Sequence, residues 1–231
     1  MAQDRKNEMI IGILYILAAI TSIIAVVLYQ PILSEQWYMT VADGFQTKVL
    51  IGVLNDLFLV VAAVGTAVML YPYLRRWNEH IALGYLCFRF MESVFIAIGL
   101  VSILGLLHLS IYYEAGSFAS ENLYAVGLML QAFHRWTFML GPNLMLGLNT
   151  ILYSYLLIRT GLVPKPLALM GVVTAVMVFI AGLLEMFGTV DPMSTAKGLI
   201  ALPVGVYEMS LAVWLIVKGF NKQKLEKLKM K

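Results

Sequence analysis

The stretch MIIGILYILAAITSIIAVVLYQ, Met9–Gln30, contains no charged residue and ends immediately before Pro31. An α-helix needs roughly 20 apolar residues to cross the hydrocarbon core of a bilayer. The stretch is too long for the apolar core of a cleaved signal peptide, and no small-residue cleavage motif follows it. It therefore predicts a transmembrane helix that is retained in the mature protein.

Five further apolar stretches follow the first. The predicted spans are residues 9–30, 48–72, 81–107, 136–158, 165–187 and 197–218. Of the 231 residues, 61% are hydrophobic and only 13% are charged. A soluble domain has about 25% charged residues, so this chain has too little polar surface to cover a soluble core. We predict an all-α, polytopic membrane bundle of six transmembrane helices, with one membrane domain over residues 1–220 and a basic tail at 221–231.

Lysine and arginine concentrate at every second junction between the predicted spans. The N-terminus, the loops at 75–80 and 159–165 and the tail carry most of them, whereas the intervening loops carry Glu35, Asp43, Glu114, Glu121 and Asp191. The positive-inside rule then predicts that both termini are cytoplasmic. The net charge of +3 comes mostly from the tail, and nothing in its pattern favours nucleic acid. The expected partners are membrane lipids and a small-molecule ligand.

The third and fourth spans belong to an unusually long hairpin. As helices, residues 81–113 and 122–159 would each reach about 50 Å or more, against about 30 Å of hydrocarbon. We expect both helices either to extend past the outer leaflet or to bend, with a turn at 115–121. A bend would lie at Gly141–Pro142, where proline removes a backbone donor. A turn centred on Glu121 places His108 and His134 at the same height near the outer interface.

Several ionisable residues lie inside or beside the spans, where burial is expensive and favours pairing or contact with water. Depths estimated at about 1.5 Å per residue separate these residues into two layers. The middle layer holds Arg89, Glu92 and Glu208. The outer layer holds Asp56, His134, Arg135 and Glu185. Two layers of complementary charge predict a polar cavity open to the external side; the alternative is that the charges only hold helices together.

Helical spacing suggests how these groups meet. Arg89 and Glu92 are three residues apart and share a face, and we expect Arg89 to pair with Glu208, with Glu92 as the competing partner.

The fourth helix adds Asn149 and Tyr153, which fall on approximately the same stripe as His134 and Gly141. In the outer layer, Asp56, His134 and Glu185 are expected to line one water-accessible pocket.

A series of short motifs in a fixed order gives the chain a resemblance to a known family. The motifs are Leu54–Leu57, Phe88–Phe90, Phe133–Arg135, Tyr155–Gly161 followed by Pro164, and the closing stretch with Pro203, Glu208, Trp214 and Lys218–Gly219. In these motifs, from the first helix to the last, the chain resembles the bacterial multi-pass membrane proteins known as domain of unknown function 4386. The resemblance implies a protein of about six helices in the plasma membrane of a bacterium or archaeon, and it implies no activity.

Two classes of function fit these residues. The favoured class is a non-enzymatic protein that binds or transports a small polar, anionic or lipid-like ligand, with Arg89 recognising the ligand and nearby carboxylates handling protons. The alternative is a membrane-embedded hydrolase or transferase acting on lipid near the outer leaflet, with His134 as base or metal ligand. The sequence places no nucleophile beside His134, which favours the first class. A small accessory or sensor subunit is a third alternative.

Metal and cofactor chemistry has few candidate ligands in this chain. Cys87 is the only cysteine, so an internal disulfide and a cysteine-based zinc cage are excluded. A zinc site from His108 and His134 with Asp56 or Glu185 is chemically permissible, as is haem ligation by the two histidines. No attachment motif supports haem, and we predict no cofactor.

Overall fold

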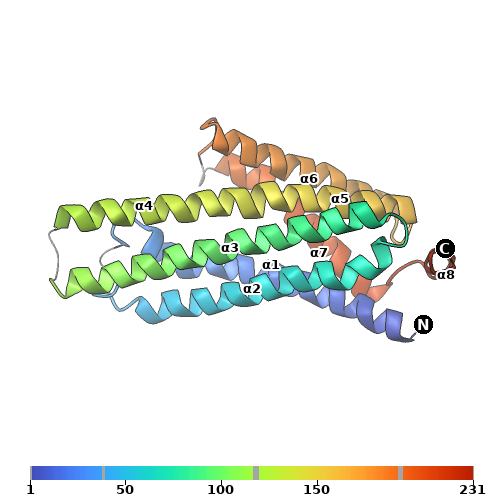
Figure 1. Cartoon of the computed structure of the whole chain (residues 1–231), viewed down its shortest axis with the longest axis horizontal. Helices are drawn as coiled ribbons and strands as arrows, with labels where there is room; N and C mark the ends of the chain where they lie inside the picture. The colour runs from blue at the N-terminus through green and yellow to red at the C-terminus, as the bar shows by residue number, and fades with distance from the viewer. Residues whose placement is uncertain (1, 38–39, 117–119, 192–194, 231) are drawn as a thin grey trace.

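The computed structural model describes residues 2–37, 40–116, 120–191 and 195–230, and the regular elements among them are helices (Figure 1). They are α1 (Ala2–Leu33), α2 (Gln46–Leu74), α3 (Glu79–Glu114), α4 (Ser120–Phe138), the π-helix η2 (Met139–Met145), α5 (Leu146–Thr160), α6 (Lys165–Met186), α7 (Thr195–Val217) and α8 (Lys222–Lys229). Among the described residues, five helices are long and apolar enough to cross a membrane, namely α1, α2, α3, α6 and α7. The predicted all-α class is confirmed.

The long helices form a closed ring of antiparallel rods. α4, η2 and α5 follow one another along a single rod (Figure 1). α1 packs on α2, α2 on α3, α3 on α4 and α5, α5 on α6, α6 on α7, and α7 back on α1. Both ends of the chain lie at the same end of the bundle (Figure 1), which we call the proximal end, and the opposite end is the distal end.

Apolar and polar side chains are distributed in the reverse of a soluble protein. Ile23, Val61 and Val101 lie on the outside and are 69%, 67% and 69% exposed, whereas Arg89 and Asn149 are 3% and 0% exposed. Lipid chains solvate exposed aliphatic groups, and polar groups then face inward, where they find partners. This distribution agrees with the apolar lengths of the helices in favouring a multi-pass membrane protein.

Local sequence explains several of the helix ends. Asn78 precedes α3, and its side chain accepts a hydrogen bond of 3.0 Å from the backbone N–H of Ile81, as a helix N-cap does. α5 ends at Gly161, whose φ of 65° is left-handed and therefore favours glycine. Pro164 then separates α5 from α6.

At the distal end the first four rods continue past the ends of α6 and α7 (Figure 1). We call this part the distal extension. Its core surrounds Trp37, which is fully buried and lies against α4 at Gly127, where a Cβ would overlap the indole. Gln131 of α4 also donates a hydrogen bond of 2.9 Å to the carbonyl of Ser34. The long hairpin therefore packs against the chain that follows α1.

The register of this hairpin corrects one prediction. Gly99 of α3 lies against His134 of α4, and Gly105 lies against Leu130. Continuing this antiparallel register places His108 about two helical turns distal to His134. The two histidines are therefore not at the same height. Residues 117–119 of the predicted turn lie outside the described residues. His108 is exposed and meets the ring of Tyr112 edge-on at 4.8 Å.

At the proximal end, the first and last helices are joined by polar contacts. The guanidinium of Arg5 donates to the carbonyl oxygens of Leu215, at 2.7 Å, and of Ile216. These carbonyls belong to the last turn of α7, where intrahelical partners are lacking.

The C-terminal residues fold back as α8 on the same end of the bundle. Leu225 and Leu228 are buried in the main core, and Lys229 Nζ lies 2.9 Å from Asp4 Oδ2. The hydrogen bond to Asp4 raises the pKa of the Lys229 ammonium above its ordinary value. Asn221 caps α8 by accepting from the backbone N–H of Lys224 at 3.1 Å.

Candidate functional site

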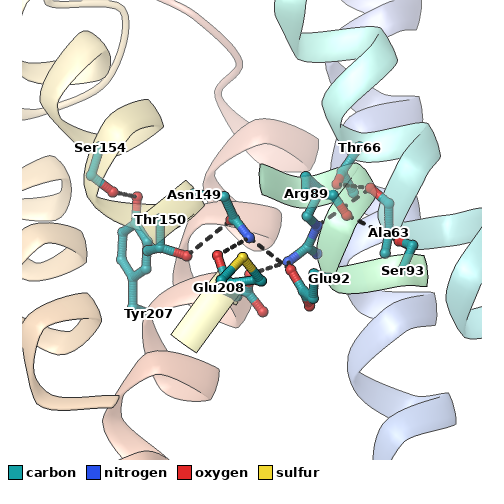
Figure 2. A network of polar contacts seen from close by, with 11 residues as sticks. Ala63, Thr66, Arg89, Glu92, Ser93, Asn149, Thr150, Ser154, Tyr207 and Glu208 are labelled. Atoms are coloured by element: carbon teal, nitrogen blue, oxygen red, sulfur yellow. Dashed lines mark hydrogen bonds and ion pairs between the residues drawn. The ribbon is translucent and has the colours of Figure 1, made fainter. Parts of the chain in front are cut away.

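The centre of the ring holds a buried ion-pair cluster (Figure 2). Arg89 on α3 lies 3.0 Å from Glu92 Oε2 on the same helix and 3.6 Å from Glu208 Oε1 on α7. Its Nε donates to the carbonyl oxygen of Ala63 on α2 at 3.4 Å. The predicted pairing of Arg89 with Glu208 and Glu92 is confirmed, and the nearer carboxylate is that of Glu92.

Glu92 is the well-satisfied carboxylate of this cluster. It accepts hydrogen bonds from Arg89 at both oxygens, at 3.3 and 3.0 Å, and from the Asn149 amide of α5 at 2.7 Å. The same amide donates to the backbone carbonyl of Met145 at 2.8 Å, and the Thr150 hydroxyl donates to Asn149 Oδ1 at 3.4 Å. The sequence places Asn149 among the residues of a polar cavity, and in the structure its amide contacts Glu92 of this cluster.

Glu208 is much less satisfied than Glu92. Its side chain is 13% exposed, its Oε1 lies 3.6 Å from Arg89, and that oxygen has no hydrogen-bond partner among the described residues. A buried carboxylate oxygen without a hydrogen bond is expensive, because neither water nor a protein donor replaces its hydration. The cluster therefore has one under-satisfied acceptor, on α7.

Four tyrosines surround the cluster on its proximal side. They are Tyr15 of α1, Tyr85 of α3, Tyr153 of α5 and Tyr207 of α7, and all are at most 1% exposed. The Tyr153 ring packs at 5.2 Å from Tyr85, 6.1 Å from Tyr207 and 6.2 Å from Tyr15, measured between ring centroids. The Arg89 guanidinium also lies over the Tyr15 ring at 5.9 Å. Each of the four interacts electrostatically with Glu208.

Three of these tyrosines have hydroxyls without a regular hydrogen bond. The Tyr207 hydroxyl pairs with Ser154 at 2.9 Å (Figure 2). Those of Tyr15, Tyr85 and Tyr153 are buried, and none of them makes a hydrogen bond of regular geometry with the described part of the chain. Buried hydroxyls are normally partnered. Here the Tyr85 hydroxyl lies close to Tyr15 and Thr66, and the Tyr153 hydroxyl lies close to Tyr207, but none of the three makes a hydrogen bond of regular geometry.

Glycines bring the helices close enough to form this centre. A Cβ at Gly171 of α6 would overlap Ser154 Oγ and the Tyr207 ring. At Gly141 in η2 it would lie 2.8 Å from Phe95 Cβ and 3.1 Å from the Glu92 carbonyl of α3.

Gly141 and Pro142, where the sequence suggests a bend, both lie in the π-helix η2. Such π segments are frequent at functional sites, and this one leads directly into the turn that carries Asn149.

A second polar group lies distal to the cluster. Asp56 of α2 is 6% exposed and lies close to the buried hydroxyl of Tyr29 of α1, without a hydrogen bond of regular geometry between them. Asn55 bridges Asp56 Oδ1 at 3.5 Å and the Thr21 carbonyl at 2.7 Å. The Tyr29 ring meets the His134 ring edge-on at 6.1 Å. Asp56 and His134 therefore share Tyr29 as a neighbour.

His134, Glu185 and Arg135 make their other contacts away from Asp56. His134 Nδ1 donates to the carbonyl of Gly99 at 3.3 Å. Glu185 forms an ion pair of 2.5 Å with Lys197, and none of its described contacts joins it to Asp56 or His134. Arg135 is exposed, with its guanidinium 5.5 Å from the centre of the Trp136 ring. Asp56 and His134 thus have Tyr29 as a common neighbour and no described contact with each other, and Glu185 and Arg135 lie elsewhere.

No metal-binding group of three or more histidine, cysteine, aspartate or glutamate side chains is present among the described residues. His108 and His134 are separated along the hairpin, and Glu185 is paired with Lys197. Cys87 is exposed on the outside of the bundle, beside an apolar hollow lined by Val64, Val68 and Phe90.

Sequence reasoning missed Tyr15, Tyr207 and Lys197. Tyrosine in membrane helices is most frequent at the interfaces. The position of Tyr15 and Tyr207 well inside their apolar stretches is therefore the sequence feature that could have pointed to a buried polar site. Lys197 was placed at the start of a helix, and nothing in the sequence related it to Glu185.

A family model matches residues 10–219 of the chain, which includes every residue of the cluster. No curated protein and no solved structure matches the chain. Because the family model covers residues 10–219, the protein belongs to the family described as "Domain of unknown function (DUF4386)".

Proposed function

We propose that the protein is a non-enzymatic membrane protein that binds or transports a small polar ligand at the centre of its helix ring. The observation that carries this proposal is a set of buried polar atoms around Glu208 that make no hydrogen bond of regular geometry with the described residues: one carboxylate oxygen and the hydroxyls of Tyr15, Tyr85 and Tyr153. Polar contacts that served only to join helices would satisfy one another. Measured contacts of that kind contribute only about 0.6 kcal/mol on average, which is little against the cost of burying several polar groups.

The proposal includes a membrane topology. The rod formed by α4, η2 and α5 is the sixth span, because η2 and α5 together are about the length that crosses the hydrocarbon. The proximal end is cytoplasmic, since it carries the basic junctions. The distal extension then lies on the external side, and the membrane is the plasma membrane of a bacterium or archaeon.

We further propose that ligand reaches the centre from the external side. Ser93, Thr137 and Asn143 are buried polar residues on α3, α4 and η2, and Asn143 Nδ2 has no hydrogen-bond partner among the described residues. Together with His134, Tyr29 and Asp56 they provide polar groups between the cluster and the distal extension.

The nature of the ligand follows from how Arg89 is engaged. Two carboxylates already contact its guanidinium, so it offers little to an anion. Free acceptors and hydroxyls favour a ligand that donates hydrogen bonds. The hydrolase alternative gains no support, because the described contacts of His134 are a backbone carbonyl, a tyrosine ring and its own helix.

Removing a single unpartnered hydroxyl tests the proposal. Full-length protein in nanodiscs would be screened by thermal unfolding against amino acids, amines, sugars and small carboxylates, and the affinity of any hit compared with that of Tyr153→Phe. A lost hydrogen bond of about 1.4 kcal/mol weakens binding about tenfold. The apo protein should lose little stability, because this hydroxyl makes no hydrogen bond of regular geometry with the described residues.

The matched control is Tyr207→Phe, which removes the hydroxyl bonded to Ser154 and should lower the stability of the apo protein. If Tyr153→Phe destabilises the apo protein like the control and leaves every affinity unchanged, the hydroxyls are structural and the proposal fails.

A further inference from the structure

The central cluster carries more negative than positive formal charge. The charged or titratable groups that face Glu208 are Tyr15 from α1, Tyr85, Arg89 and Glu92 from α3, Tyr153 from α5 and Tyr207 from α7. The tyrosines are uncharged near pH 7. One guanidinium therefore faces two carboxylates, which leaves a surplus of one negative charge when both are ionised.

The surplus is located at Glu208. Glu92 accepts from Arg89 and Asn149 at 2.7 to 3.3 Å, whereas Glu208 has the single longer ion pair of 3.6 Å. An uncompensated carboxylate in a low-dielectric interior is strongly unfavourable. The folded protein therefore gains stability from anything that supplies one positive charge at Glu208.

The surroundings of Glu208 suit a small cation. The hydroxyls of Tyr15, Tyr85 and Tyr153, which make no hydrogen bond of regular geometry, offer oxygen lone pairs, and aromatic rings attract cations through their faces. The rings pack within 5.2 to 6.2 Å of Tyr153, so a bulky ligand would have to separate them. A divalent ion would overcompensate a surplus of one charge and normally takes six or more oxygen ligands.

We propose that Glu208 is an exchange site for one small monovalent cation, an inference that rests on the proposed function because it assigns the charge of the ligand. The positive charge is supplied by a proton, by an ammonium or primary amine, or by an alkali-metal ion. These sources share one chemistry, which is neutralisation of Glu208 beside tyrosine oxygens.

The test uses full-length protein in nanodiscs and follows the midpoint of thermal unfolding by circular dichroism. The variables are pH, from 5 to 9 in roughly one-unit steps, and the chlorides of sodium, potassium, ammonium and methylammonium at constant ionic strength, with N-methylglucamine as the balancing cation. The variants are Glu208→Gln, which is isosteric and neutral, and Glu185→Gln, which neutralises the carboxylate paired with Lys197.

In the wild type the midpoint should fall as rising pH ionises Glu208, and a binding cation should restore it progressively with the logarithm of its concentration. Glu208→Gln should be at least as stable as the wild type at high pH and should lose both responses. Glu185→Gln should keep them. A response to pH with none to the four salts identifies the proton as the cation, whereas a response to ammonium and methylammonium alone identifies an amine.

The inference is overturned if Glu208→Gln keeps the wild-type responses, or if it is less stable at every pH, as a merely structural carboxylate would make it. Its failure is distinguishable from failure of the proposed function. A neutral ligand that binds with Tyr153-dependent affinity, without any cation response, would keep the function and discard the cation site.

Discussion

Arg89 and Glu92 lie three residues apart on α3, so the helix itself holds the first counterion of the guanidinium. Glu208 reaches the same group from α7. Since one partner is local and the other is brought by the fold, the two carboxylates contribute differently. Glu92 offsets the cost of burying the charge of Arg89 within α3, whereas Glu208 links α3 to α7 through an ion pair.

Removing Arg89 should therefore harm the protein more than removing it together with Glu208. Arg89→Leu leaves two carboxylates without a counterion, and breaking a buried pair on one side typically costs about 3–5 kcal/mol. The double variant Arg89→Leu/Glu208→Leu should recover part of this loss of stability. Thermal unfolding of the wild type and both variants in one detergent measures it.

The surface variant Lys222→Met is the control and should behave like the wild type in that assay near neutral pH, because Lys222 is exposed. A double variant that loses about the sum of the two single losses would show that Arg89 and Glu208 do not interact.

At single positions, sequence reasoning succeeded where depth along a helix was sufficient. Arg89, Glu92 and Glu208 were assigned to one layer because helical rise fixes depth within each span. It failed where the outcome depended on the partner. Glu185 has nearly the depth of Asp56, but it binds Lys197, and depth alone does not say which way a side chain faces.

At the scale of elements, the rod of α4, η2 and α5 joins two environments. α4 packs in the distal extension, and α5 faces the tyrosines. The sequence indicated a bend because proline cannot continue the hydrogen-bond ladder, but the π-helix depends on tertiary packing of Gly141 against α3. The same limit explains the misplaced histidines, because the turn between α3 and α4 could be bounded by composition but not positioned to the residue.

The helix α8 is held by two buried leucines. Each contributes about 1.5–3 kcal/mol by burial, so the double variant Leu225→Ser/Leu228→Ser should release α8 from the bundle. Amide hydrogen exchange at residues 222–229 should then accelerate by about tenfold or more.

The exposed pair Lys222→Ser/Lys227→Ser is the control and should leave exchange nearly unchanged. Equal acceleration in both double variants would mean that α8 is not anchored through its leucines.

At the scale of the whole molecule, both chain ends lie at the proximal end of the ring of rods, so the proposed six-span topology puts both on one side of the membrane. The basic residues of the proximal end favour the cytoplasm. In a Cys87→Ala background, which removes the exposed native cysteine, Asp43→Cys should react with a membrane-impermeant maleimide in intact cells.

In the same assay Lys227→Cys should react only after the cells are opened. Labelling of Lys227→Cys and not of Asp43→Cys in intact cells would reverse the orientation, and labelling of both would contradict the six-span topology.

The contact between α1 and α7 has a consequence for biosynthesis. The ring closes between α1 and α7. The face of α1 that packs on α7, including Arg5, therefore has no partner until α7 has been synthesised near the end of translation. In the proposed topology, α3 enters the membrane with Arg89 and Glu92 three residues apart, and this local counterion lowers the penalty of partitioning the arginine into lipid. Glu208 emerges only afterwards. Packing of α7 then adds a second carboxylate to the neutral Arg89–Glu92 pair. The cluster gains its surplus negative charge only when α7 packs against the other helices.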